Sequence, residues 1–213
     1  WACAKLAWLP AGLLAALEAP EQLARLQAMR PQALANSAWA CGALGFSGKR
    51  LPGAWLQEAA RQLSASAGAS FNAQELANLA WSAAVLDLQQ HAGEAVALAA
   101  ACSARWATVV PQDLRQLHQV HVWLQGLGRT QGLGGALSPQ QLAQCAAAWA
   151  EQLEGHSGKE SATQRAVFAA LQALPSATWA QALQLEQATP DGVLSIDIAA
   201  VTAASQRLAI EVD

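Results

Sequence analysis

The sequence has little charge and few aromatic residues other than tryptophan. Charged residues make up 13% of its 213 residues, tyrosine is absent, and there are three phenylalanines and one methionine. The formal net charge is −3, so the chain lacks the basic excess that is typical of nucleic-acid binders. It also lacks an uninterrupted apolar run of about 18 residues, so we expect no membrane partner. Apolar residues nevertheless make up 54%, enough for a large core.

The cysteines and histidines form no metal-binding or redox motif. Cys3 and Cys41 lie 38 residues apart, and Cys102 and Cys145 are isolated, so no C-x-x-C pair exists. We interpret all four as small apolar packing residues, reduced in a compartment without disulfides. His118 and His121 lie one helical turn apart but have no third ligand nearby. The sequence therefore predicts no cofactor.

Tryptophan, in contrast, is abundant and periodic. Nine are present, and Trp1, Trp39 and Trp81 open the similar segments WACAKL, WACGAL and WSAAVL, at spacings of 38 and 42 residues. The similarity continues upstream, since residues 29–39 read MRPQALANSAW and residues 71–81 read FNAQELANLAW. A period of this length is typical of stacked helical repeats.

A fourth unit and the helices within each unit follow from the same alignment. Residues 112–124 (QDLRQLHQVHVWL) fit the register, with Gln119 in place of the tryptophan, as expected of an atypical terminal repeat. Apolar residues between 73 and 86 follow helical spacing on two faces, which predicts a first helix buried from both sides. A second helix is expected after a recurrent glycine, as in residues 54–65.

The character of the chain changes after this array. Residues 126–137 are rich in glycine and form either a flexible linker or an ordered turn between the array, residues 1–125, and a second part, residues 138–213. That part contains an amphipathic helix at 160–174 and then the first β pattern of the chain, with strands at 193–201 (VLSIDIAAV) and 207–213 (RLAIEVD). We therefore predict a mainly α fold, an α-solenoid of helix-pair repeats followed by a small α/β module.

The repeats and the ending resemble a known family. ALANSAWACGALGF and ELANLAWSAAVLDL resemble octotricopeptide repeats, the helical-pair arrays of green-algal organelle RNA-binding proteins. LSIDIAAVTAASQRLAIEVD resembles the start of a RAP domain, a restriction-endonuclease-like α/β module that often closes such proteins. The chain begins without methionine inside an expected helix and stops before the rest of that module. We therefore expect it to be a piece of a longer protein with an incomplete module.

The resemblance implies that the first helix of each pair binds RNA, one or a few bases per repeat. Base contacts would come from equivalent positions that vary between units, namely Lys5, Ala43 and Val85, Arg30 and Asn72, and Asn36 and Asn78. For the asparagines, the alternative is capping of a neighbouring backbone. Phosphate contacts would come from Arg25, Arg30, Lys49, Arg50, Arg61 and Arg105, whose alternative is an ordinary solvated surface role. Trp106, Trp123, Trp149 and Trp179 are either stacking platforms or packing residues.

The resemblance to restriction-endonuclease-like modules also raises a catalytic alternative. Such enzymes hold Mg²⁺ with an acidic residue on one strand and an Asp/Glu-x-Lys motif on the next. Asp197 and Glu211 occupy the analogous places here, and Asp213 stands where the lysine would be. Mg²⁺ is expected only under this alternative.

The resemblance thus implies an RNA-binding protein of the chloroplast or mitochondrion. It would act in transcript stabilisation, processing or translation. One alternative is a structural subunit of an organellar ribosome that binds ribosomal RNA and other ribonucleoprotein subunits. Further alternatives are a metal-dependent ribonuclease, and a solenoid that scaffolds other proteins without RNA.

Overall fold

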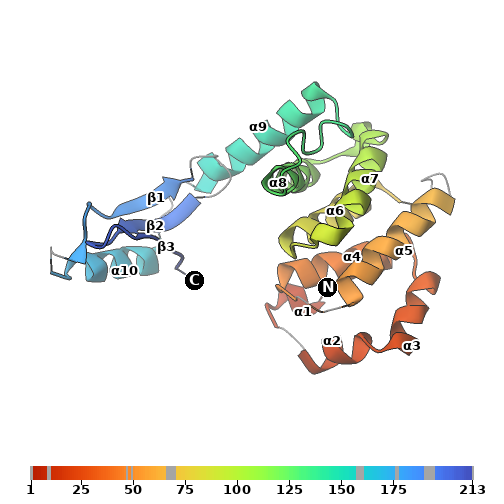
Figure 1. Cartoon of the computed structure of the whole chain (residues 1–213), viewed down its shortest axis with the longest axis horizontal. Helices are drawn as coiled ribbons and strands as arrows, with labels where there is room; N and C mark the ends of the chain where they lie inside the picture. The colour runs from red at the N-terminus through yellow and green to blue at the C-terminus, as the bar shows by residue number, and fades with distance from the viewer. Residues whose placement is uncertain are drawn as a thin grey trace. The chain divides into compact units, whose positions relative to one another are not determined.

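The computed structural model describes residues 2–8, 11–46, 48, 50–65, 71–156, 161–175, 178–189 and 195–212. Within them the chain is mainly helical, with a small three-stranded antiparallel sheet toward its C-terminal end (Figure 1). It divides into two compact units, Trp1–Ala148 and Trp149–Asp213, hereafter the helical unit and the sheet unit.

The helices of the helical unit can be sorted by their place in the predicted pairs. The first helices are α4 (Pro31–Ala43), α6 (Ala73–Val85) and α8 (Pro111–Gly126), preceded by the short α1 (Ala2–Lys5). The second helices are α2 (Ala11–Leu17), α5 (Leu51–Ala65), α7 (Ala92–Ser103) and α9 (Pro139–His156), the last of which continues past the boundary of the unit. Connecting turns include α3 (Pro20–Leu23), η1 (Ala24–Ala28), η2 (Gln89–His91) and η3 (Trp106–Thr108).

The first helices pack side by side in one row. α1 contacts α4, α4 contacts α6, and α6 contacts α8, as Figure 1 shows for the orange, yellow-green and green helices. α5 packs against α4 and α6, and α7 packs against α5 and α6. Leucines at the centre of this packing, such as Leu34, Leu76 and Leu117, are fully buried. Burial of a leucine side chain contributes about 1.5–3 kcal/mol, so this row forms the main core.

Local sequence explains where these helices begin. Pro31 and Pro111 are the first residues of α4 and α8, where the missing N–H costs nothing. At α6, Asn72 accepts from the Glu75 N–H at 2.8 Å, and Glu75 accepts from the Asn72 N–H at 2.9 Å. The second helix α5 begins at Leu51, three residues before the predicted start. The prediction was wrong there because the recurrent glycine, Gly53, lies inside the first turn rather than before it.

The helices of the row share one kind of ending that the sequence pattern had not indicated. Ala7, Gly45, Asp87 and Gly128 all have positive φ, between 49° and 79°. In each case the next residue donates its N–H to the carbonyl five residues back, for example Leu88 to Ala83 at 2.9 Å and Arg129 to Leu124 at 3.1 Å. This is the Schellman ending, which directs the chain out of the helix toward its partner.

The glycine-rich segment after α8 is an ordered turn. Leu133 and Leu137 are buried in the core of the helical unit. The N–H of Leu133 donates to His121 Nδ1 at 3.0 Å, and Gly132, with φ of 52°, lies directly against the His121 ring. Of the two interpretations of this segment, the structure supports the ordered one.

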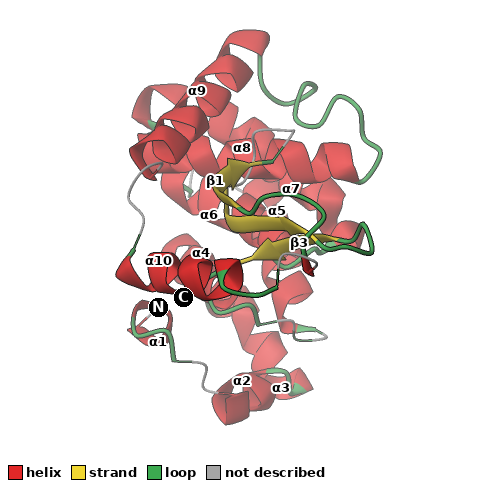
Figure 2. Cartoon of the chain, turned by 90° about the vertical axis from the view of Figure 1, so that its left-hand side faces the viewer, coloured by secondary structure: helices red, strands yellow, loops and turns green. Residues whose placement is uncertain are grey.

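The sheet unit is built from one helix and three strands. α10 (Ala162–Gln172) packs against β2 (Ser195–Val201), which pairs antiparallel with β1 (Gln184–Ala188) and with β3 (Arg207–Ile210), as Figure 2 shows in red and yellow. β2 is the central strand, and its Ile198 and Ala200 are buried. The sequence predicted β2 and β3 but not β1, so the prediction that the β pattern begins at residue 193 was wrong. Residues 190–194 and 213 lie outside the described part of the chain.

Candidate nucleic-acid interface

Side chains 38 residues apart hydrogen-bond to each other in the helical unit. Gln116 Nε2 on α8 donates to Asn78 Oδ1 on α6 at 2.9 Å, and Trp81 Nε1 on α6 donates to Gln119 Oε1 on α8. These are the pairs of positions that the sequence alignment makes equivalent. Positions that correspond in sequence therefore lie next to each other in adjacent helices, which gives the row a defined register.

The same spacing links the next helices along the chain. Ser103 Oγ donates to Gln141 Oε1 at 3.0 Å, and Trp106 Nε1 donates to Gln144 Oε1 at 2.7 Å. Both glutamines lie on α9 within the helical unit. These four contacts use neutral amide, indole and hydroxyl groups, which form hydrogen bonds without burying a charge.

Of the recurrent tryptophans, Trp39 and Trp81 belong to the described residues, and both are half-buried. Trp1 lies outside the described residues. Lys5 Nζ lies 5.4 Å from the centre of the Trp39 ring, within cation–π range. Trp81 places its ring against Gly42 of α4, where an added Cβ would be 2.9 Å from the ring. Position 42 therefore has no room for a side chain.

The other tryptophans considered as stacking platforms are also anchored. Trp149 is buried, and Trp179 donates to the carbonyl of Leu171 at 3.1 Å. Trp106 and Trp123 are half-buried, and each donates its indole N–H to another element. Only these two of the four combine partial exposure with a fixed ring in the helical unit.

The asparagines proposed as base contacts have different surroundings. Asn78 is 7% exposed and its oxygen accepts from Gln116, so it contributes to packing between α6 and α8. Asn72 caps α6, and the equivalent Arg30 precedes α4 without a side-chain cap bond. Asn36 is half-buried on α4. Asn72 therefore caps a backbone N–H, whereas Asn78 bonds to the side chain of Gln116 rather than to the neighbouring backbone that the alternative expected.

The arginines proposed as phosphate contacts also separate into two groups. Arg25, Arg30 and Arg50 have exposed side chains, and Lys49 lies outside the described residues. Arg105 is half-buried and donates to the Ala101 carbonyl at 2.7 Å, at the end of α7. The first three remain candidates for phosphate contacts, whereas Arg105 already has a role at a helix end.

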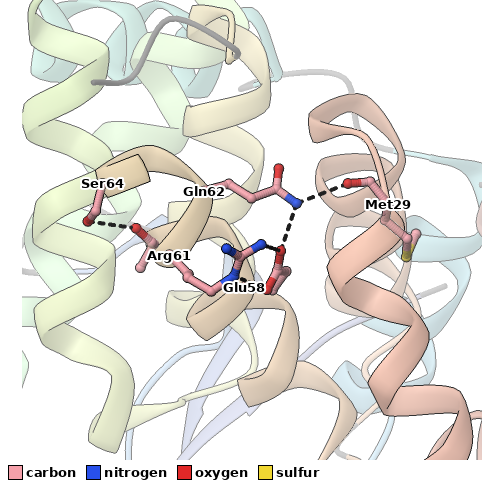
Figure 3. Close-up of polar contacts among 6 residues, drawn as sticks. Met29, Glu58, Arg61, Gln62 and Ser64 are labelled. Carbon is pink, nitrogen blue, oxygen red and sulfur yellow. Dashed lines mark hydrogen bonds and ion pairs between the residues drawn. The ribbon is translucent and has the colours of Figure 1, made fainter. Parts of the chain in front are cut away.

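Arg61 belongs to a polar cluster on α5 that Figure 3 shows. Its Nε and Nη2 donate to the two carboxylate oxygens of Glu58 at 2.8 and 2.6 Å. Gln62 Nε2 donates to the same carboxylate at 2.8 Å and to the Met29 carbonyl at 3.0 Å. The Arg61 hydrogen bond is the main reason that the pKa of Glu58 is lowered. This pairing makes Arg61 a weaker phosphate ligand than its 55% exposed side chain suggests.

One set of equivalent positions stays at the surface along the whole row. Lys5 on α1, Ala43 on α4 and Val85 on α6 are exposed, with Val85 at 45%. The register of the Trp81–Gln119 contact adds Trp123 of α8, which is half-buried. We call these four residues the surface column. Its members differ in every helix, whereas the positions used for packing stay similar.

Charge is distributed unevenly between the two units. Residues 1–148 contain nine basic and seven acidic residues, a formal charge of +2. Residues 149–213 contain three basic and eight acidic residues, a formal charge of −5. The acidic balance of the chain therefore comes from the sheet unit, and it does not describe the surface of the helical unit.

The carboxylates of the sheet unit are held by other groups. Asp197 accepts from Gln164 Nε2 at 2.7 Å and from the Val212 N–H at 2.8 Å, one bond to each oxygen. Gln164 also donates to Glu186 at 2.9 Å. The pairing of β2 with β3 ends at Ile198 and Ile210, and Asp197 and Glu211 are the residues next to that pair. Asp213 lies outside the described residues.

No metal centre emerges from the described part of the chain. Within it, no group of three or more histidine, cysteine or acidic residues is arranged to hold a metal ion. His121 instead accepts from Leu133, and burial lowers the pKa of both His118 and His121. The four cysteines are free, and burial raises the pKa of Cys102 and Cys145 to about 12. None of the described helices is both long and apolar enough to cross a bilayer.

Comparisons with protein-family models, with curated proteins and with solved structures give no match to this chain. The class of protein that the structure defines is a mainly helical chain with a small antiparallel sheet.

Proposed function

We propose that residues 1–125 form a short α-solenoid that binds single-stranded RNA through the surface column. In this proposal the protein is an organellar RNA-binding factor that acts on transcript stability, processing or translation. The observation that carries it is the contrast within the row of first helices. Equivalent positions such as Asn78 and Gln116 make similar packing contacts, whereas Lys5, Ala43, Val85 and Trp123 vary and remain accessible.

Such an arrangement suits a polymer with a regular repeat. Each helix of the row offers one variable side chain at the same level, which is how helical-repeat proteins read successive bases. The helical unit carries a formal charge of +2, and Arg25, Arg30 and Arg50 are exposed there. These residues supply the phosphate contacts in this proposal, with weak, salt-dependent affinity because they are few.

The nuclease alternative is not part of the proposal. Both oxygens of Asp197 accept hydrogen bonds from the protein, and a metal ion would have to displace Gln164 or the Val212 N–H. The Asp/Glu-x-Lys motif is also incomplete, since Asp213 stands in place of the lysine. Binding rather than cleavage is therefore the function proposed for the RNA.

The test compares two changes of an exposed apolar residue to glutamate. Val85→Glu alters the surface column, and Leu174→Glu alters a residue of the sheet unit with nearly the same exposure, 43% against 45%. Binding of a random-sequence 20-nucleotide RNA pool is measured by filter binding at 50 mM salt, with Tm as a check on folding. We expect Val85→Glu to weaken binding by about tenfold, because it sets a carboxylate against the phosphates, and Leu174→Glu to change it by less than about twofold.

Crosslinking of the same pool, with the sites mapped by mass spectrometry, gives an independent result. Crosslinks on α4, α6 and α8 support the proposal. Absence of binding by the unaltered chain, or equal binding by both variants, would refute it.

A further inference from the structure

Asp87 carries a side chain at a left-handed position that glycine would occupy with less strain. It is the left-handed residue at the end of α6, with φ of 49°. The equivalent residue at the end of α4 is Gly45, with φ of 62°. A left-handed conformation costs an L-residue free energy that glycine avoids, although aspartate tolerates it better than most. Ala7, at the corresponding position after α1, has the same φ of 49°, so the role of the Asp87 side chain has to be read from its contacts.

The contacts of the Asp87 side chain show what that role is. Its Oδ1 accepts from Trp123 Nε1 on α8 at 2.8 Å, and its Oδ2 accepts from Gln89 Nε2 at 2.9 Å. These two hydrogen bonds, Trp123 first, lower the pKa of Asp87, so it stays ionised at neutral pH. Asp87 itself is exposed, so its side chain does not fill the core. It fixes the orientation of the indole ring of its neighbour.

Trp123 is the member of the surface column with the greatest capacity for stacking. By the register of the Trp81–Gln119 hydrogen bond it corresponds to Val85, which is 45% exposed on the adjacent helix. α8 continues beyond it to Gly126, and the exposed Arg129 follows at the end of the same helix. An indole that stacks and an exposed arginine on the following turn are the residue types that suit a nucleotide, whose base stacks and whose phosphate is anionic.

We propose that Trp123 stacks on a base of the bound single-stranded RNA and that Asp87 is its positioning residue. This inference rests on the proposed function and identifies the place in the surface column where affinity is concentrated. A stacked base is read by shape rather than by its hydrogen-bonding edge, so this position tolerates all four bases. The remaining members, Lys5, Ala43 and Val85, then account for any preference among bases.

Trp106 offers a matched comparison within the same unit. Like Trp123 it is half-buried, and it donates its indole N–H across helices, to Gln144 at 2.7 Å. It lies on η3, outside the row of first helices and outside the surface column. Equal changes at the two tryptophans therefore separate a contact with RNA from a general loss of packing.

The experiment measures binding of the random 20-nucleotide pool by the full 213-residue chain and four variants. Trp123→Ala should weaken binding by about fivefold to a hundredfold, the range for loss of one stacked base. Trp123→Phe keeps a ring and should stay within about threefold of the unaltered chain. Trp106→Ala should change binding by less than about twofold.

Asp87→Gly separates positioning from folding. It removes the acceptor for Trp123 and also the strain of the left-handed aspartate, so Tm should change little. Binding should nevertheless weaken by about threefold or more, because the ring is no longer held. A purely structural role predicts instead that affinity is unchanged wherever Tm is unchanged.

Crosslinks from a pool that contains 4-thiouridine should map to the peptide that includes Trp123. If the unaltered chain binds no RNA, the proposed function and this inference both fail. If the chain binds RNA but the Trp123 and Asp87 variants bind as tightly as it does, only this inference fails. Crosslinks that map only to peptides without Trp123 would likewise contradict the inference about Trp123 but leave the proposed RNA binding intact.

Discussion

The helical unit and the sheet unit use polar residues in different ways. In the helical unit, neutral pairs such as Gln116 with Asn78 join adjacent helices, and the formal charge is +2. In the sheet unit, Gln164 joins the carboxylates of Glu186 and Asp197, and the formal charge is −5. The net charge of −3 is thus a sum of unlike parts. The net charge of the chain would therefore count against RNA binding by the helical unit only if charged residues were spread evenly over both units.

Removal of a buried aliphatic side chain tests how much core each unit has. Leu117→Ala on α8 should cost about 2–5 kcal/mol, because Leu117 is fully buried among other leucines. Ile198→Ala on β2 should cost less, because the neighbouring Ile196 and Ile210 are only half-buried and can relax. Hydrogen exchange of the α8 amides and of the β2 amides measures the stability that each variant loses. A larger loss of protection in β2 than in α8 would contradict the expectation that the helical unit has the more tightly packed core.

The bridging glutamine tests how the sheet unit tolerates its acidic groups. Gln164→Glu replaces the shared donor with a third carboxylate and should destabilise β2 by about 1–3 kcal/mol at pH 7. Lowering the pH should restore part of this loss, since a protonated carboxyl can donate again. Hydrogen exchange at pH 7 and pH 5 measures both effects, and Gln172→Ala at the exposed end of α10 is the control. Equal protection in Gln164→Glu and the unaltered chain would show that the bridge contributes nothing.

The glycine-rich turn of the helical unit tests whether order there depends on one position. Gly132→Ala should destabilise the unit by about 1–3 kcal/mol, because Gly132 has φ of 52° and lies against His121. Gly135→Ala should be neutral within about 0.5 kcal/mol, because nothing lies within 4 Å of a Cβ there. Urea unfolding followed by circular dichroism compares the two. If both variants lowered the free energy of unfolding by a similar amount, the conformation at Gly132 would not be what orders the turn.

A buried acid on α8 gives the smallest expected effect. Asp113 is 1% exposed, its Oδ2 accepts from the Val110 N–H at 3.1 Å, and its Oδ1 has no partner among the described residues, as is also true of Gln116 Oε1. Burial raises the pKa of Asp113, and Cys102 is a neighbouring group that titrates. Asp113→Asn keeps the acceptor, removes the buried charge and should stabilise the unit by about 1 kcal/mol at pH 7.

The stabilisation by Asp113→Asn should depend on pH, because the pKa of Asp113 is raised in the folded state. A raised pKa in the folded state means that the stabilisation from protonated Asp113 is full at low pH and is lost as pH rises through that pKa. The advantage of Asp113→Asn over the unaltered chain should therefore shrink as pH falls from 7 toward 4. Tm measured at several pH values tests this, and an advantage independent of pH would contradict it.

The row of first helices could be predicted from sequence because its signal is local and repeated. The tryptophan segments placed α4 and α6, and the weaker alignment of Gln119 with Trp81 agrees with the hydrogen bond between those two residues. The Schellman endings could not be predicted, because Ala7 and Asp87 stand where glycine would have marked them. β1 was missed for a related reason. Its residues, QLEQA, include no β-branched or aromatic residue, and the strand exists through pairing with β2.

The candidate site was only partly visible in the sequence. Variation among Lys5, Ala43 and Val85 could be read from the alignment, but the partners of Arg61 and Asn78 depend on residues that the fold brings together. Trp123 was considered as a stacking platform among four tryptophans. Its hydrogen bond to Asp87 distinguishes it from the other three. That bond joins residues 36 positions apart, so no short sequence pattern could have indicated it.

The two hydrogen bonds between corresponding positions of α6 and α8 bear on how the helical unit could be shortened. Asn36 and Trp39 are the counterparts of Asn78 and Trp81, so they match the residues that Gln116 and Gln119 already contact. Excision of the 42 residues from 43 to 84 would present Gln116 and Gln119 with the same two partner types. The two hydrogen bonds of α8 thus require no residue type that α4 lacks at the corresponding positions.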